Sequence, residues 1–144
     1  MKNNPKNKAA SGAYANRTLA RTVVFQLLFL EDVNADSPTD WTNEFLSENL
    51  PDHEEVLKFA RQLMQGVRKN ESELNQKIEQ QSKNWTLTRM SVTDRNILRL
   101  ALYELLYIKT PKAVVINEAI ELAKKFGTAD SSAFVNGILD RFEV

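Results

Sequence analysis

Apolar residues along this 144-residue chain recur at three- and four-residue intervals, the spacing of one face of an α-helix, and they do not alternate as in a half-buried strand. Only four glycines and four prolines interrupt the pattern. The pattern predicts an all-α protein, a compact bundle of about seven helices. The predicted helices span, approximately, residues 17–31, 37–50, 52–69, 70–79, 91–108, 111–126 and 131–142.

Local signals mark several helix ends. Ser37–Pro38 and Thr110–Pro111 each place a capping side chain before a first-turn proline. Gly66, inside the third helix, costs about 1 kcal/mol relative to alanine, so we expect a close helix approach or a break there. Two other helix starts leave the capping residue open, between Ser91 and Thr93 and between Asp130 and Ser131.

The first helix and the residues before it differ in character. Residues 1–14 are rich in Asn, Lys and Ala without an apolar stripe, so we expect a disordered basic arm ahead of a single all-α domain over residues 15–144. The first helix has a wide apolar face and is predicted to be mostly buried. That face comprises Leu19, Val23, Val24, Leu27, Leu28 and Leu30.

Composition excludes several kinds of site. The chain has no cysteine and one histidine, so disulfides, thiol catalysis and Cys- or multi-His metal sites are excluded. We therefore expect no metal and no cofactor. His53 lies in an acidic helix start, which favours a solvated first-turn residue over a triad member. No apolar run approaches the ~20 residues that span a bilayer, and no signal peptide is evident, so we expect a cytoplasmic protein without membrane contact.

The formal net charge of zero is an average over three unlike blocks. Residues 1–30 hold five bases and no acid, residues 31–57 hold nine acids and no base, and residues 58–144 hold fourteen bases and ten acids, so +5 − 9 + 4 = 0. The acidic block is interpreted as a solvated helix face, with a docking surface for a basic protein as the alternative. It would direct any nucleic acid toward the first block.

The basic first block is a candidate phosphate-binding surface, and the alternative is a solubilising tail. Arg17 and Arg21 lie one turn apart and extend the charge onto the folded body. Phe29 is two turns further on, where it either stacks on an RNA base or belongs to the core. The three lysines of the block are Lys2, Lys6 and Lys8.

No group of residues joins a nucleophile, a base and an oxyanion donor, so we expect no enzyme. Glu118 and Glu121 are three residues apart and present two carboxylates on one helix. Because Lys125 follows Glu121 by four residues, an exposed ion pair is the simpler interpretation.

Three segments in this order carry a resemblance: SVTDRNILRLALYEL from Ser91, INEAIELAKKFG from Ile116 and FVNGILD from Phe134. Together with Arg17 and Arg21 in the first helix, they make residues 17–142 resemble the NusB family of bacterial transcription antitermination factors. The resemblance implies an all-α fold of two helical subdomains. A ribosomal RNA cytosine methyltransferase family with a NusB-like domain is disfavoured, because the chain has no βαβ pattern and no Gly-rich cofactor loop.

The resemblance also implies a function and a set of site residues. Family members bind the boxA element of ribosomal RNA operon transcripts, as single-stranded RNA, together with the ribosomal protein NusE, and join an antitermination complex on RNA polymerase. The RNA-binding residues carried over to this chain are Arg17, Arg21, Phe29, Asp130 and Phe134, with the three lysines of the basic block. The NusE-facing surface includes an acid that falls on Asp94.

The chain departs from the family at two places in the first helix. The consecutive arginines of other members are replaced by Thr18, Leu19 and Ala20, and the usual tyrosine is Phe29. Lysines of the arm supply charge without the planar fork of arginine. We therefore expect this chain to depend more on its protein partner for RNA affinity.

Overall fold

The computed structural model describes residues 5–36, 40–83 and 85–144, with side chains from Gly12 onward. Over these residues the chain forms seven α-helices, one 3-10 turn, one π-helical turn and no strand, so the predicted all-α bundle is confirmed. The elements are α1 (Pro5–Val33), α2 (Thr42–Asn49), α3 (Glu54–Lys69), α4 (Glu71–Gln81), η1 (Leu87–Arg89), α5 (Val92–Tyr103), η2 (Glu104–Ile108), α6 (Lys112–Phe126) and α7 (Ser131–Asp140). None of the helices within the described ranges is both long and apolar enough to cross a bilayer.

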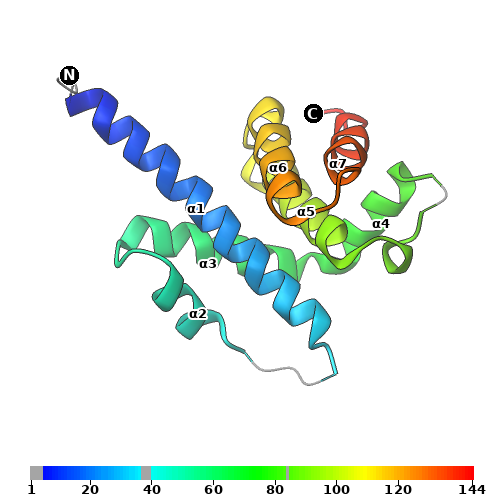
Figure 1. The fold of residues 1–144 in the computed structure, drawn as a ribbon, viewed down its shortest axis with the longest axis horizontal. Coiled ribbons are helices and arrows are strands. Elements are labelled where there is room, and N and C mark those ends of the chain that lie inside the picture. Colours follow the sequence, from blue (N-terminus) through cyan, green and yellow to red (C-terminus); the bar gives the residue numbers. More distant parts are fainter. Residues whose placement is uncertain (1–4, 37–39, 84) are drawn as a thin grey trace.

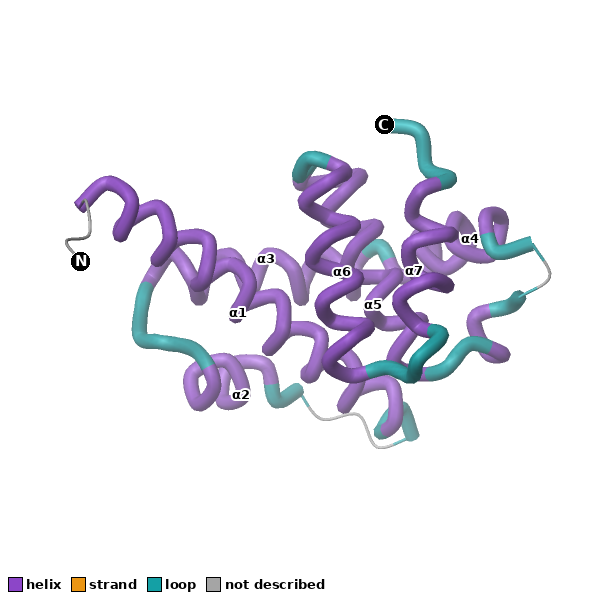
Figure 2. The backbone as a smooth tube through the Cα atoms, turned by 45° about the horizontal axis from the view of Figure 1, so that its top comes forward, coloured by secondary structure: helices purple, strands orange, loops and turns teal. Residues whose placement is uncertain are grey.

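The helices form two groups joined by α5. Helices α1, α2 and α3 pack on one another, α4, α6 and α7 surround α5, and both α1 and α3 also contact α5. Figures 1 and 2 show α6 and α7 side by side over α5, and α1 crossing α3. The N-terminal turns of α1 extend away from the other helices in both views. The grouping agrees with the two helical subdomains that the resemblance implies.

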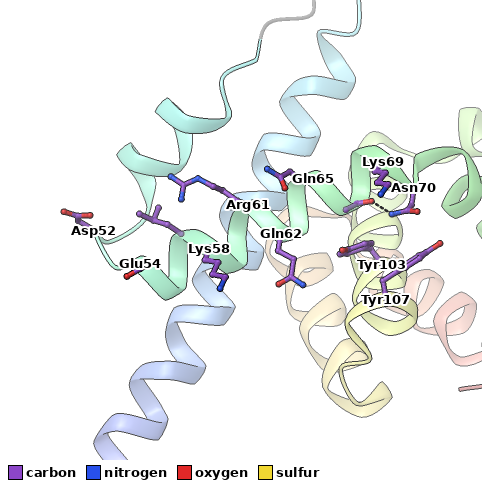
Figure 3. Close-up of a pocket in the computed structure, with 12 residues that line it drawn as sticks. Asp52, Glu54, Lys58, Arg61, Gln62, Gln65, Lys69, Asn70, Tyr103 and Tyr107 are labelled. Carbon is purple, nitrogen blue, oxygen red and sulfur yellow. Dashed lines mark hydrogen bonds between the residues drawn. The ribbon is translucent and has the colours of Figure 1, made fainter.

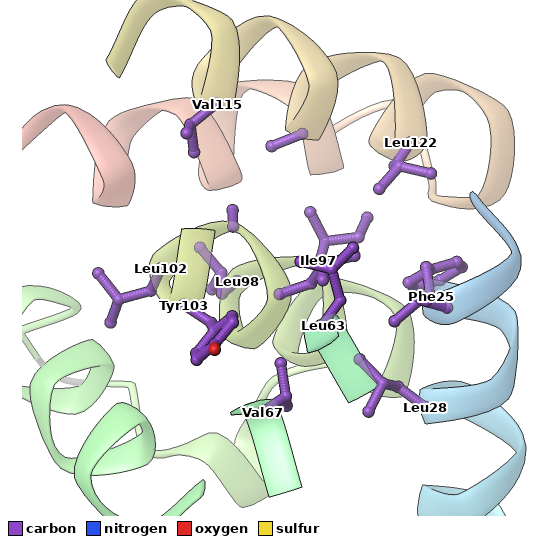
Figure 4. Packing of buried hydrophobic residues seen from close by; sticks show 14 of the residues in the cluster. Phe25, Leu28, Leu63, Val67, Ile97, Leu98, Leu102, Tyr103, Val115 and Leu122 are labelled. Atoms are coloured by element: carbon purple, nitrogen blue, oxygen red, sulfur yellow. The ribbon is translucent and has the colours of Figure 1, made fainter. Parts of the chain in front are cut away.

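Helix α5 is the centre of the core. All eight of its residues from Asn96 to Tyr103 are buried, which is typical of a helix surrounded by other helices. In Figure 4, Ile97, Leu98 and Leu102 of α5 lie between α6 on one side and α1 and α3 on the other. The first helix, by contrast, is buried only along its second half, and Leu19 is 38% exposed.

Helix α1 begins at Pro5, well before the predicted start near Arg17. Residues 5–14, expected to belong to a disordered arm, are therefore helical in the structure. Pro5 suits the first position of a helix, and the alanines that follow have the highest helix propensity. The absence of an apolar stripe thus reflects a helix without neighbours, not the absence of a helix. Lys2 lies outside the described residues.

Of the predicted helix caps, the one at the start of α5 is confirmed. Ser91 caps α5, because its Oγ accepts a hydrogen bond from the Asp94 N–H at 3.0 Å. At α6 the residue in the capping position is Pro111, not Thr110, and its carbonyl accepts from Val114 and Val115. Ser37 and Pro38 lie outside the described residues, and α2 begins at Thr42, whose N–H donates to Asp40 at 3.0 Å. Asp130 precedes α7 without a side-chain cap bond.

Gly66 marks a close approach of α3 to α5, as its position predicted. A Cβ at residue 66 would overlap the Tyr103 ring. That ring is 8% exposed and stacks on Tyr107, with centroids 5.3 Å apart and an interplanar angle of 18°. The glycine therefore allows the Tyr103 ring to lie against the α3 backbone.

Gly66→Ala is expected to destabilise the protein by about 1 kcal/mol. Overpacking of a core costs about 1–3 kcal/mol, and the better helix propensity of alanine returns about 1 kcal/mol of that. Urea unfolding measures the difference. Gly137→Ala is the matched control: no atom lies within 4 Å of its Cβ position, so this exposed change in α7 should stabilise instead. Equal effects from the two variants would contradict the packing explanation.

Candidate functional site

Arg21 is a core residue, and the expectation that it extends the basic surface onto the folded body is wrong. Its side chain is 4% exposed. Nε donates to Glu104 Oε2 at 2.7 Å and Nη2 to Oε1 at 2.8 Å, while Nη1 lies 3.2 Å from Glu118 Oε1. A guanidinium held by two buried carboxylates has no free fork for a phosphate.

The remaining cations of the first block lie along α1. Arg17 is exposed, with its guanidinium carbon 4.5 Å from the centroid of the Phe59 ring on α3. Lys6 and Lys8 lie in the first turn of α1, in the part that extends away from the body. The first helix therefore provides an accessible cation at Arg17 and two lysine positions beyond it.

Phe29 is half-buried, so the structure retains both interpretations of this ring. It packs on Phe25, with centroids 6.4 Å apart, and Phe25 in turn packs on Phe126 of α6 at 5.1 Å. The three rings line a cavity of about 400 Å³, together with Phe45 and Thr93 among others. The cavity is open and mainly aromatic, which suits a base or an apolar side chain of a partner.

The start of α7 places Asp130 and Phe134 just beyond this cavity. Asp130 is exposed and follows Phe126 by four residues. Phe134 is half-buried, and its ring lies against Trp85 with centroids 6.1 Å apart and an interplanar angle of 75°. The α6–α7 connection therefore joins two aromatic groups, one around Phe29 and one around Phe134.

Asp94 is a partly buried acid in the first turn of α5. Its Oδ1 has no hydrogen-bond partner among the described residues. Thr93, the preceding residue, lines the cavity next to Phe29. A buried acceptor without a donor is costly and is satisfied when a partner supplies one. The role of Asp94 in a partner contact stays a prediction.

Another cavity among the described residues contains none of the predicted site residues. It is an open groove of about 1060 Å³ along α3, next to Tyr103 and Tyr107 (Figure 3). Its exposed cations are Lys58, Arg61 and Lys69. Most of the residues that line the groove are polar, and Phe59 is not among them.

The two carboxylates considered for acid–base chemistry do not share a site. Glu118 is buried and also accepts a hydrogen bond from the Thr18 hydroxyl at 2.8 Å. Glu121 is exposed and lies 3.7 Å from Lys124, not Lys125. Glu118 therefore has a structural role in the core, and Glu121 belongs to the exposed surface of α6.

Asp32 forms a charged network with residues 63 to 67 positions away, which no local pattern in the sequence indicates. Its carboxylate accepts from Arg95 at 2.6 and 2.7 Å, from Asn96 at 2.8 Å and from Arg99 at 3.0 Å. Burial by itself would raise the pKa of Asp32, but these hydrogen bonds and the charges of Arg95 and Arg99 outweigh it and hold the pKa below its usual value. The network fixes the end of α1 against α5.

The acidic block is therefore only partly a solvated face. Asp32 is held by the network, and Glu31 pairs with Arg68 of α3. The later acids of the block that the structure describes are exposed. They are Asp36, Asp40, Glu44, Glu48, Asp52, Glu54 and Glu55.

Comparisons with known proteins agree with this fold. The model of the NusB family matches residues 17–144. The chain is 45% identical over 127 residues to the transcription antitermination protein NusB of Anaeromyxobacter dehalogenans, covering 88% of this chain and 89% of that one. It is also 45% identical over 125 residues to the protein of that name from Geobacter sulfurreducens, covering 86% and 91%.

Solved structures extend the likeness to three dimensions. The structure of T. maritima NusB is 42% identical with a TM-score of 0.78, covering 87% of this chain and 88% of that one. A chain in a crystal structure of the antitermination factors NusB and NusE in complex with double-stranded RNA is 25% identical with a TM-score of 0.78, covering 88% and 94%. By sequence and by fold, this chain belongs to the NusB family.

Proposed function

We propose that the chain is a transcription antitermination factor that binds boxA RNA of ribosomal RNA operon transcripts together with ribosomal protein NusE. It then joins the antitermination complex on RNA polymerase and acts as a binding adaptor, without catalysing a reaction. The observation that carries the proposal is the match over 88% of this chain to a chain in a NusB–NusE–RNA structure. Membership of a family whose curated relatives are named as antitermination proteins supports it.

The physical features of one region support the same function. Phe29 and Phe126 line an open cavity with several aromatic rings. Asp130 and Phe134 follow Phe126 in the chain by four and eight residues. Single-stranded RNA is bound by such rings through base stacking, and by nearby cations through its phosphates. Lys2, Lys6, Lys8 and Arg17 are the proposed phosphate contacts, and Asp94 the proposed NusE contact.

Because Arg21 is buried, we expect NusE to contribute more, and the first helix less, to the affinity for RNA. One arginine fewer on the surface lowers the phosphate-binding capacity of the first helix, so NusE carries a larger part of the RNA affinity. An alternative, a protein-interaction module whose basic tail only aids solubility, predicts NusE binding that is unaffected by RNA.

Replacing Lys2, Lys6 and Lys8 with glutamine is expected to flatten the salt dependence of boxA binding in the presence of NusE. Each phosphate contact to a single strand contributes about 0.7 to the slope of log affinity against log salt, so the slope should fall by about 2. Titrations of labelled boxA RNA at several salt concentrations measure it. Lys6 and Lys8 lie in the first turn of α1, which extends away from the other helices, and Lys2 precedes the described residues, so we expect folding to be unchanged.

Scrambled RNA of the same length and composition is the specificity control for this titration. The proposal predicts that the parent protein with NusE prefers boxA over the scrambled sequence. Equal affinity for both RNAs, with NusE present, would overturn the proposed function. If the salt dependence is unchanged in the triple lysine variant, the phosphate contacts lie on the folded body and not on these lysines.

A further inference from the structure

We infer that Trp85, with Arg89 and Phe134, forms a stacking site for one unpaired RNA base. The inference rests on the proposed RNA-binding function and adds a site to it. Trp85 is 47% exposed, and its ring lies nearly perpendicular to that of Phe134. The Arg89 guanidinium carbon lies 5.3 Å from the centroid of the Trp85 ring. Stacking of bases on such rings, with cation–π support from arginine, is how single-stranded RNA is held.

Hydrogen bonds hold the backbone of Trp85 itself and of Leu87. Ser82 is buried, and its hydroxyl donates to the Trp85 carbonyl while its own carbonyl accepts from the Trp85 N–H at 3.3 Å. Two residues later, the Leu87 N–H donates to the Glu79 carboxylate at 3.0 Å, and the Leu87 side chain is buried. A single exposed aromatic is ordinary, but one fixed between two anchors is preorganised for a flat ligand.

The charges around the ring favour RNA over an apolar peptide as the occupant. Lys83 and Arg89 are exposed, and neither forms an ion pair with any residue that the structure describes. Arg141 donates to the carbonyl of Gln81, immediately before Ser82, and adds a third exposed cation. Arg89 beside the ring, with two further exposed cations near Ser82 in the chain, suits a base together with its neighbouring phosphates.

The site is continuous with the proposed RNA-binding face. Phe134 lies in the first turn of α7, four residues after Asp130, and its ring packs against Trp85. RNA that follows the α6–α7 connection from the Phe29 cavity therefore reaches Trp85 next. The stacking site lengthens the RNA path by one base beyond Phe134.

Trp85→Leu is expected to weaken boxA binding in the presence of NusE by about 5- to 150-fold, the range for loss of one stacked base. Trp85→Phe should retain most of the affinity, because it keeps an aromatic face. The matched control is Trp41→Leu, which removes the chain's only other tryptophan, 38% exposed beside α2 in the acidic block, and should leave RNA affinity unchanged. Thermal unfolding checks that each variant folds.

Fluorescence gives a second readout in the full-length protein. In the Trp41→Phe variant Trp85 is the single tryptophan, and stacking of a base on it should quench its emission as boxA RNA is added.

Unchanged emission at saturating RNA, with unchanged affinity of Trp85→Leu, would overturn the inference and leave the proposed function intact. Weaker NusE binding by Trp85→Leu without RNA would overturn it by making Trp85 a protein contact. Absence of boxA preference in the parent protein would overturn both.

Discussion

Arg21→Met is expected to lower the free energy of unfolding by about 3–5 kcal/mol, the cost of removing one partner from a buried ion pair. Glu104 and Glu118 are 2% and 6% exposed, and Arg21 is the cation that holds both. Its loss leaves two carboxylates in the core with hydroxyl partners alone, from Thr18 and Thr110. Urea unfolding at neutral pH measures the change.

Arg17→Met is the control for this experiment. Both guanidinium groups lie over the Phe59 ring, at 4.5 Å for Arg17 and 5.5 Å for Arg21, but Arg17 is exposed. Loss of an exposed cation–π contact costs only about 0.5–1 kcal/mol. Similar losses in the two variants would contradict the assignment of Arg21 to the core.

A further variant keeps the test informative if Arg21→Met does not fold. Replacing Arg21, Glu104 and Glu118 together by apolar residues removes all three charges and should recover much of the lost stability, because uncharged cores are often as stable as buried ion pairs. This triple variant should also retain boxA affinity. A large fall in RNA affinity in a folded triple variant would return Arg21 to the RNA-binding surface.

Asp32→Asn is expected to cost about 2–3 kcal/mol at neutral pH, because the amide keeps one acceptor oxygen for the two arginines and loses the other, and one charged hydrogen bond contributes about 1.5–3 kcal/mol. The pKa of Asp32 is lowered in the folded protein, so its contribution is present above the unfolded pKa of about 3.9 and is lost as the pH falls through the folded pKa. The parent protein should therefore lose this part of its stability in acid, and Asp32→Asn should not.

Unfolding of both proteins at a series of pH values from 7 to 3 checks this prediction. The difference between them should shrink as the pH falls below about 4. Asp36→Asn, an exposed acid one turn further along the chain, is the control and should change stability little at any pH. A difference that stays constant down to pH 3 would show that the amide disturbs packing and that charge is not the cause.

Most of the fold follows from short-range signals that a sequence displays. Ser91 caps α5 because its side chain needs only the residue three positions later, and Gly66 indicates a close approach because glycine inside a helix is otherwise unfavourable. The start of α1 was misjudged because burial and helix formation are separate properties. Residues 5–14 have helix propensity without an apolar face.

The candidate site was less predictable because its residues depend on partners far away in the chain. Arg21 is 83 residues from Glu104, and nothing near Arg21 indicates that its charge is neutralised. A signal was nevertheless present: Glu104 and Glu118 each stand among apolar residues, and carboxylates in such surroundings need a cation. Trp85 was missed because it lies between helices, where periodicity carries no information.

The first turns of α1 extend away from the bundle, so they set the distance from the bundle at which the protein first contacts a polyanion. At a rise of about 1.5 Å per residue, Lys6 lies roughly 16 Å beyond Arg17 along the helix axis. A strand that contacts both must bridge that span without support from the bundle. The protruding first turns of α1 therefore attract a polyanion before it reaches the bundle. Their charge should affect the association rate more than the lifetime of the complex.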